Sequence, residues 1–260
     1  MKQSEAERNQ AGRGAAIRFL ASNSLATNFL AGPGTLPGAS NCAILAAQYD
    51  SNLGSIALRR GYHHGNLREA LIEAALSLIA EKGSGGLTFA DAARAAGVSP
   101  AAPYRHFRDR EALLAEVAQR GFQLFGETLA KAAAHGSPEP LKALDRVGKA
   151  YLRFAREEPA YYAAMFESGV AIGSNPELRA AAEAAFAAVR SAVEAVIATL
   201  PAASRPPALM MTLHIWSQAH GIASLFGRAD GARRPIPMSP EELLEAAVLI
   251  YLRGLVTAQS

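Results

Sequence analysis

Side chains that can bind phosphate groups and base edges gather between Thr88 and Arg110. Tyr104, Arg105 and His106 follow one another within this stretch. Arginine and lysine neutralise phosphates, hydroxyl groups donate hydrogen bonds to phosphate oxygens, and an arginine can bind guanine through two hydrogen bonds. The surrounding residues 59–120 carry nine basic and seven acidic side chains, whereas residues 121–260 carry thirteen of each. This pattern indicates a small polyanion-contacting module beside a neutral body.

The elements that must position these residues are short helices joined by a glycine turn. Thr88 opens one predicted helix, with Asp91 in a capping-box position, and Gly97 ends it. Ser99 is the expected N-cap of the next helix, with Pro100 at its first position. A turn of three to four residues that contains glycine is typical of a helix-turn-helix. An earlier helix, capped by Asn66 and ending at Gly83, completes a predicted three-helix domain.

The rest of the chain also has helical periodicity, and β-branched clusters are rare. A helix capped by Asp109 is expected to reach about residue 135, and five more follow at about 138–157, 159–170, 175–200, 205–228 and 239–258. The sequence therefore predicts an all-α fold of about nine helices. The expected organisation is a disordered or atypical extension over 1–58, a helix-turn-helix domain over 59–110, and an effector-binding and dimerisation domain over 111–260.

The helix-turn-helix block resembles the TetR family of transcriptional repressors. The resemblance is carried by Tyr62–Arg68, by Thr88–Ser99, by Tyr104–Phe107 and by the Arg110–Leu114 segment. A weaker resemblance, to the family's subgroup with a Trp…His-Gly motif, is carried by Tyr161, Tyr162, Met165, Phe166, Trp216, His220 and Gly221. The resemblance implies a homodimeric, ligand-responsive repressor that binds a pseudo-palindromic operator and is released by a small apolar or amphipathic effector.

Each residue of the block receives an expected role from this resemblance and from its chemistry. Thr88 and Arg110 are expected to hold phosphates, while Tyr104 and His106 match positions that contact the DNA backbone and sometimes bases. Arg105 either binds guanine or faces a phosphate or solvent, and the sequence leaves both open. The remaining residues expected on or beside the reading face are Ser99, Pro100, Ala101 and Ala102, of which the alanines offer only methyl contacts.

Pro103 departs from the family pattern, which often has an aliphatic residue there. A proline at the fourth helical position loses the first hydrogen bond back to Ser99. The first turn of the third helix is therefore expected to be loosened or 3₁₀-like. Arg59 and Arg60, before the first helix, form either a minor-groove arm or a solvated linker. His63 and His64 lack a third ligand, so no metal site is expected.

Aromatic residues and methionines cluster in the body. They form either an ordinary helix-packing core or a mostly apolar effector pocket with a few polar groups. Tyrosine and tryptophan need hydrogen-bond partners when buried, and His220 lies one turn after Trp216 on the same helix face. The candidate effector-binding residues are Phe125, Tyr151, Phe154, Tyr161, Tyr162, Met165, Phe166, Trp216 and His220.

The last two helices are expected to pair with those of a second chain as a four-helix bundle. Dimerisation would place two reading elements about 34–36 Å apart, in successive major grooves of a pseudo-palindrome. The residues expected to form this interface are Leu213, Gln218, Leu225, Leu243, Leu244, Ala247, Ile250, Tyr251 and Gly254.

Several function classes lack their signatures in this sequence. It contains no nucleophile elbow, dinucleotide-binding fingerprint, phosphate loop or zinc-protease motif, so neither an enzyme nor a cofactor is expected. No stretch approaches 18 uncharged apolar residues, and no signal peptide is expected. The single cysteine, Cys42, suits a reducing, cytoplasmic location. A helical adaptor without DNA binding is the remaining alternative, and only the Thr88–Arg110 block argues against it.

Overall fold

The computed structural model describes residues 67–134, 139–226 and 237–257. Within these ranges the chain forms eight α-helices and four short 3₁₀-helices, with no strand, which confirms the predicted all-helical class. The α-helices are α4 (Leu67–Lys82), α5 (Phe89–Ala95), α6 (Arg110–Ala134), α7 (Pro140–Glu157), α8 (Pro159–Phe166), α9 (Pro176–Thr199), α10 (Ala208–Phe226) and α11 (Pro240–Thr257).

Helix α5 begins and ends where local chemistry predicts. Thr88 caps α5, because its hydroxyl accepts a hydrogen bond from the Asp91 backbone N–H at 3.0 Å. α5 ends in a turn at Gly97, whose φ of 72° lies in the left-handed region that glycine adopts without steric cost. The expected helix–turn entry into the next element is therefore present.

The third helix is where the structure corrects the sequence prediction. No α-helix starts at Pro100; a turn there leads into a 3₁₀-helix over Ala102–Arg105. The Ala102 N–H donates to the Ser99 carbonyl at 3.0 Å, three residues back, and Pro103 has no N–H to donate one residue later. The loosening expected of the first turn extends over the whole element, so the predicted reading helix is a short 3₁₀-helix.

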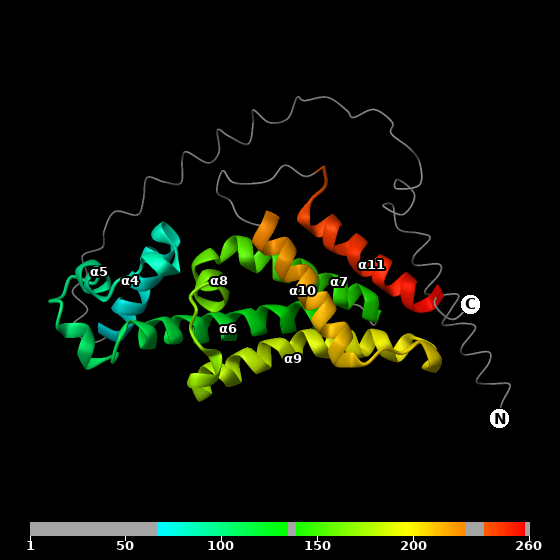
Figure 1. Cartoon of the computed structure of the whole chain (residues 1–260), viewed down its shortest axis with the longest axis horizontal. Helices are drawn as coiled ribbons and strands as arrows, with labels where there is room; N and C mark the ends of the chain where they lie inside the picture. Colours follow the sequence, from blue (N-terminus) through cyan, green and yellow to red (C-terminus); the bar gives the residue numbers. More distant parts are fainter. Residues whose placement is uncertain (1–66, 135–138, 227–236, 258–260) are drawn as a thin grey trace.

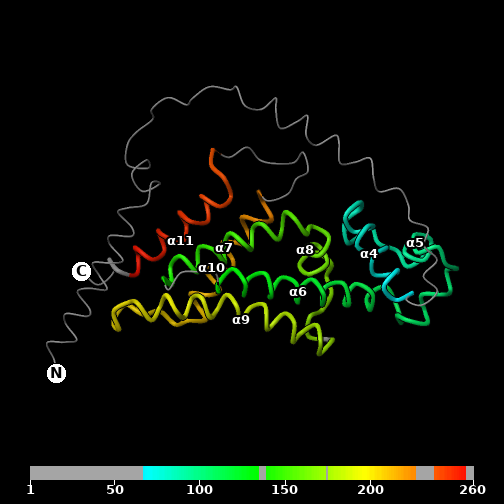
Figure 2. Tube along the Cα trace, turned by 180° about the vertical axis from the view of Figure 1, so that it is seen from behind, coloured from blue at the N-terminus to red at the C-terminus, as the bar shows by residue number. Residues whose placement is uncertain are grey.

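The body is built around α6, which runs from the helix-turn-helix end into the centre of the molecule (Figure 1). α9 lies along α6 in both views and makes its most extensive helix contact (Figure 2). α7 and α8 pack on α6, α10 packs against both α9 and α7, and α11 packs on α10 and α7. Because α6 begins at Arg110 and continues to Ala134, a single helix connects the two halves.

Several sequence predictions fall outside the described residues. They concern the disorder of 1–58, the Asn66 cap, the Arg59–Arg60 arm, the His63–His64 pair and Cys42, while the domain limits stay a prediction. In the ranges that the structure describes, no helix is long and apolar enough to cross a membrane. Over the same ranges, no three His, Cys, Asp or Glu side chains gather as a metal site would require.

Candidate functional site

The 3₁₀-helix presents three of the predicted DNA-contacting side chains to solvent. Tyr104 is 63% exposed, and Arg105 and His106 are also exposed. Pro103 and Phe107 are buried beneath them and anchor the segment to the core of the domain. The Tyr104 ring packs edge-to-face on Phe89 of α5, with centroids 4.9 Å apart. The phenol is therefore held in place by its ring while its hydroxyl is free to meet a partner molecule.

The four residues before Pro103 also lie at the surface. Ser99, Pro100 and Ala101 are exposed, and Ala102 is half-buried. Between the Gly97 turn and Phe107, only Pro103 interrupts the accessible residues of the segment 99–106, as a groove-reading element requires.

Thr88 is exposed, but its hydroxyl is already engaged. It accepts from the Asp91 N–H and donates to the Asp91 carboxylate at 2.7 Å, and Arg94 donates to the same carboxylate at 2.8 Å. The hydrogen bond from Thr88, with the positive charge of Arg94 nearby, lowers the pKa of Asp91. In this arrangement Thr88 fixes the start of α5, and its predicted phosphate contact stays a prediction.

Arg110 is turned onto the backbone between α4 and α5. Its Nε donates to the Leu87 carbonyl at 2.7 Å and its Nη2 donates to the Ser84 carbonyl at 2.6 Å. The structure thus gives this arginine a positioning role, because it ties the start of α6 to the loop before Thr88. The predicted phosphate contact of Arg110 would have to be made from this inward position.

Seven of the nine predicted effector residues form one aromatic cluster among α6, α7, α8 and α10. Phe125 lies at its centre, with ring centroids of four neighbours within 6.4 Å. Phe125, Tyr151, Phe154 and Tyr162 are buried, while three members at the margin are half-buried. The seven are Phe125, Tyr151, Phe154, Tyr162, Phe166, Trp216 and His220, and Phe186 of α9 joins them through Trp216.

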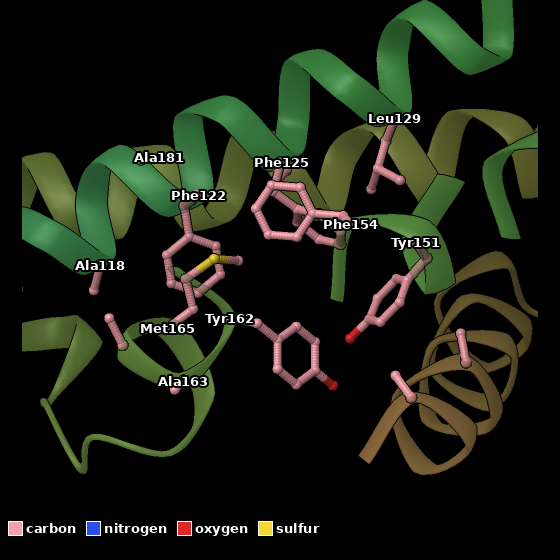
Figure 3. Packing of buried hydrophobic residues seen from close by; sticks show 14 of the residues in the cluster. Ala118, Phe122, Phe125, Leu129, Tyr151, Phe154, Tyr162, Ala163, Met165 and Ala181 are labelled. Atoms are coloured by element: carbon pink, nitrogen blue, oxygen red, sulfur yellow. The ribbon is translucent and has the colours of Figure 1, made fainter. Parts of the chain in front are cut away.

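A polar group lies inside this apolar cluster. The Tyr151 and Tyr162 hydroxyls are 3.0 and 2.9 Å from Nδ1 of His220, and the Tyr162 hydroxyl is 3.4 Å from Oγ of Ser224. Figure 3 shows the two phenol rings converging from different helices. Burial raises the pKa of Tyr151 well above its usual value, so its hydroxyl stays neutral. Two hydroxyls thus share a single ring nitrogen, which has one lone pair or one N–H to offer.

Tyr161 and Met165 are not part of this cluster, although both belong to α8. They pack against α6 at Gly121, where an added Cβ would lie 2.8 Å from the Met165 sulfur and 3.3 Å from Cβ of Tyr161. Burial raises the pKa of Tyr161, and the nearby Arg120 lowers it in part. These two residues therefore meet α6 at Gly121, about one turn before Phe125.

An ion-pair network that sequence reasoning missed joins α4 to α6. Arg68 binds the Glu116 carboxylate through two hydrogen bonds of 2.9 and 2.7 Å. Arg120 donates to the same carboxylate at 2.9 Å and to both oxygens of Glu69. The partners are 48 and 51 residues apart in sequence, so no local spacing could have indicated them.

We expect His220 to make the stability of the fold depend on pH. Burial lowers the pKa of its imidazole below the ordinary value, while the Glu167 charge opposes this in part. The unfolded chain then binds a proton more readily than the folded chain, so stability is lost as the pH falls through the unfolded value of about 6.5. We expect urea unfolding to give a lower free energy at pH 5 than at pH 7.5, with a smaller difference in His220→Gln.

A matched substitution tests whether the effect belongs to this residue. His106 is an exposed histidine that lies away from both the aromatic cluster and the expected dimer interface. His106→Gln should keep the pH dependence of the unmodified chain. If it removed as much of that dependence as His220→Gln, burial of His220 would not be its cause.

Comparisons with known proteins agree with this architecture. A family model described as bacterial regulatory proteins of the tetR family matches residues 71–117, and one described as a tetracyclin repressor-like C-terminal domain matches residues 144–251. A protein of unknown function from Rhodococcus sp. RHA1 has a similar structure, with 31% identity, a TM-score of 0.61, and coverage of 75% of this chain and 98% of that one. The TetR-family regulator PfmR from Thermus thermophilus shares the fold at 23% identity, with a TM-score of 0.54 and coverage of 71% and 96%.

A curated relative matches over a shorter stretch. The HTH-type transcriptional regulator BetI of Rhizobium meliloti (strain 1021) is 36% identical over 101 residues, which are 38% of this chain and 50% of that protein. The match thus spans half the length of that relative. The two family models together span the helix-turn-helix and most of the helical body. The chain therefore belongs to the TetR family of bacterial transcriptional regulators, with the family's helix-turn-helix domain followed by a tetracyclin repressor-like C-terminal domain.

Proposed function

We propose that this protein is a ligand-responsive repressor that binds a pseudo-palindromic operator as a homodimer. The observation that carries the DNA-binding part is the exposed group of Tyr104, Arg105 and His106, which follows the Gly97 turn and is anchored by buried Pro103 and Phe107. Side chains that donate hydrogen bonds, held on a rigid element and left accessible, are what contact with phosphates and base edges requires.

A gel-shift titration with the DNA that flanks the protein's own gene tests this proposal. Affinity should fall steeply as salt rises, because phosphate contacts release counterions. Tyr104→Ala should weaken binding about tenfold, which corresponds to about 1.4 kcal/mol for a lost contact to DNA. Arg190→Met changes an exposed arginine of α9 and should leave binding unchanged. Failure to bind any upstream segment at low salt would favour the adaptor alternative instead.

Arg105 can be assigned to a base or to a phosphate by the same assay. If Arg105 binds a guanine, Arg105→Ala should cost about 1–3 kcal/mol and relax the preference at one operator position. If it binds a phosphate, affinity should fall for all sequences alike and the salt slope should decrease by about one.

The homodimer is supported by the unusual surface of α10. This helix of 19 residues contains no lysine, arginine, aspartate or glutamate, yet Met210, Leu213 and Leu225 on it are 42–55% exposed. Ile250 of α11 is 68% exposed. A Cβ added at Gly221 or Gly254 would meet nothing within 4 Å, which leaves room for another helix to approach. Large apolar side chains exposed on a helix without formal charges are typical of an interface.

One residue expected at this interface lies elsewhere. Leu244 is buried against Gly148 of α7 in the same chain. The dimer face that we propose therefore omits Leu244 and extends along α10. Its members are Met210, Leu213, Ser217, Gln218, Gly221, Leu225, Leu243, Ala247, Ile250, Tyr251 and Gly254.

We place the effector in the aromatic cluster around His220. Small-molecule sites are mostly apolar with a few directed polar groups, and here Tyr151, Tyr162 and His220 supply those groups. Phe166 and Trp216 are half-buried at the margin of the cluster, where the effector would enter. An apolar molecule with one hydrogen-bond acceptor fits this chemistry, because only one of the two phenols can donate to Nδ1 of His220 at a time and the other could donate to the ligand.

A route from this cluster to the reading element supports the ligand response. Tyr162 and Phe166 lie on α8, and the carbonyl of Glu167 at the end of α8 accepts a hydrogen bond of 3.1 Å from Ser84. Ser84 is buried, and its own carbonyl is held by Arg110. A displacement of α8 would therefore reach the loop that precedes Thr88.

Trp216 provides the readout for the effector, because it is the only tryptophan in the chain. A ligand in the cluster should change Trp216 emission and lower operator affinity over the same concentration range. Tyr162→Phe removes one hydroxyl and should weaken both effects together. A ligand that releases DNA without altering Trp216 emission would place the effector elsewhere.

A further inference from the structure

A second site lies between α7 and α11, and none of its lining residues belongs to the aromatic cluster. It is a groove of about 410 Å³, within the range of small-molecule sites. Ile215 of α10 contributes to its lining. Its length along α7, from Leu141 to Lys149, is about 12 Å at 1.5 Å per residue. The other apolar lining residues are Leu141, Leu144, Gly148, Leu244, Val248, Leu249 and Leu252.

The two walls of the groove are held at a fixed separation. At one point α11 touches α7 directly, because a Cβ on Gly148 would lie 2.9 Å from Cδ2 of Leu244. At the end beyond it, Arg156 of α7 pairs with Glu241 of α11 at 3.0 Å. The groove is therefore a feature of the helix packing, set by a glycine contact and an ion pair.

The charged residues of the lining cancel and are already partnered. Three are basic and three acidic, namely Lys142, Arg146, Lys149, Asp145, Glu241 and Glu245. Lys149 pairs with Asp145 at 2.8 Å and Lys142 with Glu139 at 3.0 Å, while Arg146 donates to the Ala132 carbonyl at 3.0 Å. A charged ligand would lose its hydration on entering the groove and would find each charged side chain already engaged with another group. An uncharged apolar ligand has no such desolvation cost.

We propose that this groove is a binding site for a small, elongated, uncharged apolar molecule. The site lies outside the aromatic cluster, and the inference does not depend on DNA binding or on the proposed effector site. A partner helix, about 10–12 Å across with its side chains, is too large for a groove of this volume. The occupant is therefore a small molecule, and its recognition comes from apolar contact along the floor.

Fluorescence titration with the neutral probe N-phenyl-1-naphthylamine tests the site in the full-length protein. We expect saturable binding of one probe per chain, with an affinity unchanged between low and high salt. Decanol should displace the probe at least about tenfold better than decanoate or decyltrimethylammonium, because only the alcohol carries no charge. Better displacement by either ion would overturn the assignment.

Variants locate the probe. Val248 and Leu141 lie half-buried on opposite walls, so Val248→Phe and Leu141→Phe should each fill the groove and weaken binding at least about tenfold. Ala195→Phe, at an exposed position of α9, is the matched control and should bind normally. Thermal melting identifies any variant that fails to fold. If one of the two groove-filling variants fails to fold, the variant on the opposite wall provides the test.

Two outcomes would contradict the proposal. If Phe166→Ala abolished probe binding while the groove-filling variants did not, the probe would occupy the aromatic cluster instead. If binding disappeared as protein concentration rose, a second copy of the chain would be covering the groove. Neither outcome affects the gel-shift test, so failure of this inference is distinguishable from failure of the proposed repressor function.

Discussion

Leu213→Asp should convert the proposed homodimer into a monomer and weaken operator binding by about a thousandfold. Leu213 is 47% exposed on a helix without formal charges, so the chain itself should tolerate the aspartate. In a two-fold symmetric interface the change occurs twice, and each buried aspartate costs at least about 2 kcal/mol. The sum, about 4 kcal/mol, corresponds to a factor of about 10³ in the dissociation constant of the homodimer. Because the operator is bound by the dimer, its apparent affinity should fall by the same factor.

Sedimentation equilibrium and gel shifts on the same samples measure both effects. A monomer makes half the phosphate contacts of a dimer, so the salt dependence of DNA binding should also become about half as steep. Leu124→Asp places the same change on an exposed leucine of α6 and should leave the dimer intact. An unchanged molecular mass for Leu213→Asp would exclude this face of α10 from the interface.

Arg120→Met should reduce the free energy of unfolding by about 2 kcal/mol. The guanidinium holds Glu69 and Glu116 together with Arg68, and its removal leaves Glu69 without this partner and Glu116 with Arg68 alone. Breaking a buried ion pair costs about 3–5 kcal/mol, and partial exposure of these side chains reduces that figure. Urea denaturation measures the loss.

The same substitution should flatten the acid limb of the stability curve. Burial by itself would raise the pKa of Glu116, but hydrogen bonds from Arg68 and Arg120 outweigh it and lower the pKa. The hydrogen bond from Arg120 likewise lowers the pKa of Glu69. Carboxylates with depressed folded pKa values contribute stability above their unfolded pKa of about 4.3, and this stability is lost as the pH falls through the folded pKa.

An exposed pair provides the control for this network. Arg190 pairs with Glu194 at 2.8 Å on the surface of α9, with both side chains about half exposed. Arg190→Met should change the free energy of unfolding by less than about 0.5 kcal/mol. An equal loss for Arg190→Met and Arg120→Met would mean that the network between α4 and α6 adds nothing beyond a surface ion pair.

Local chemistry accounts for the elements that the sequence predicted well. The Thr88 cap, the Gly97 turn and the α6 start at Asp109, whose carboxylate accepts from the Ala112 N–H at 2.8 Å, each depend on residues within four positions of one another. The helical periodicity of apolar residues predicted α7, α9 and α11, because this signal also depends on residues close together in sequence. The prediction of an α-helix after Ser99 was wrong. The segment forms a 3₁₀-helix over Ala102–Arg105, with Pro103 near its start, so the effect of the proline is not limited to a first turn.

For the candidate sites, too, the sequence predicted some features and not others. Apolar and aromatic spacing was enough to collect most of the effector candidates, because buried aromatic residues on facing helices meet in one core. It could not indicate that Tyr161 and Met165 face α6, that Arg110 turns onto the Leu87 and Ser84 carbonyls, or that Leu244 packs on Gly148.

By itself the sequence determined the helical class, most helix limits and the family, because caps, turns and periodicity act over a few residues. Only the tertiary structure decided which side chains share a site. The Tyr151–His220 contact spans 69 residues, the Arg120–Glu69 pair spans 51, and the groove joins α7 to α11. Such partners are set by how helices cross and how closely a glycine lets them approach, and one-dimensional spacing carries neither quantity.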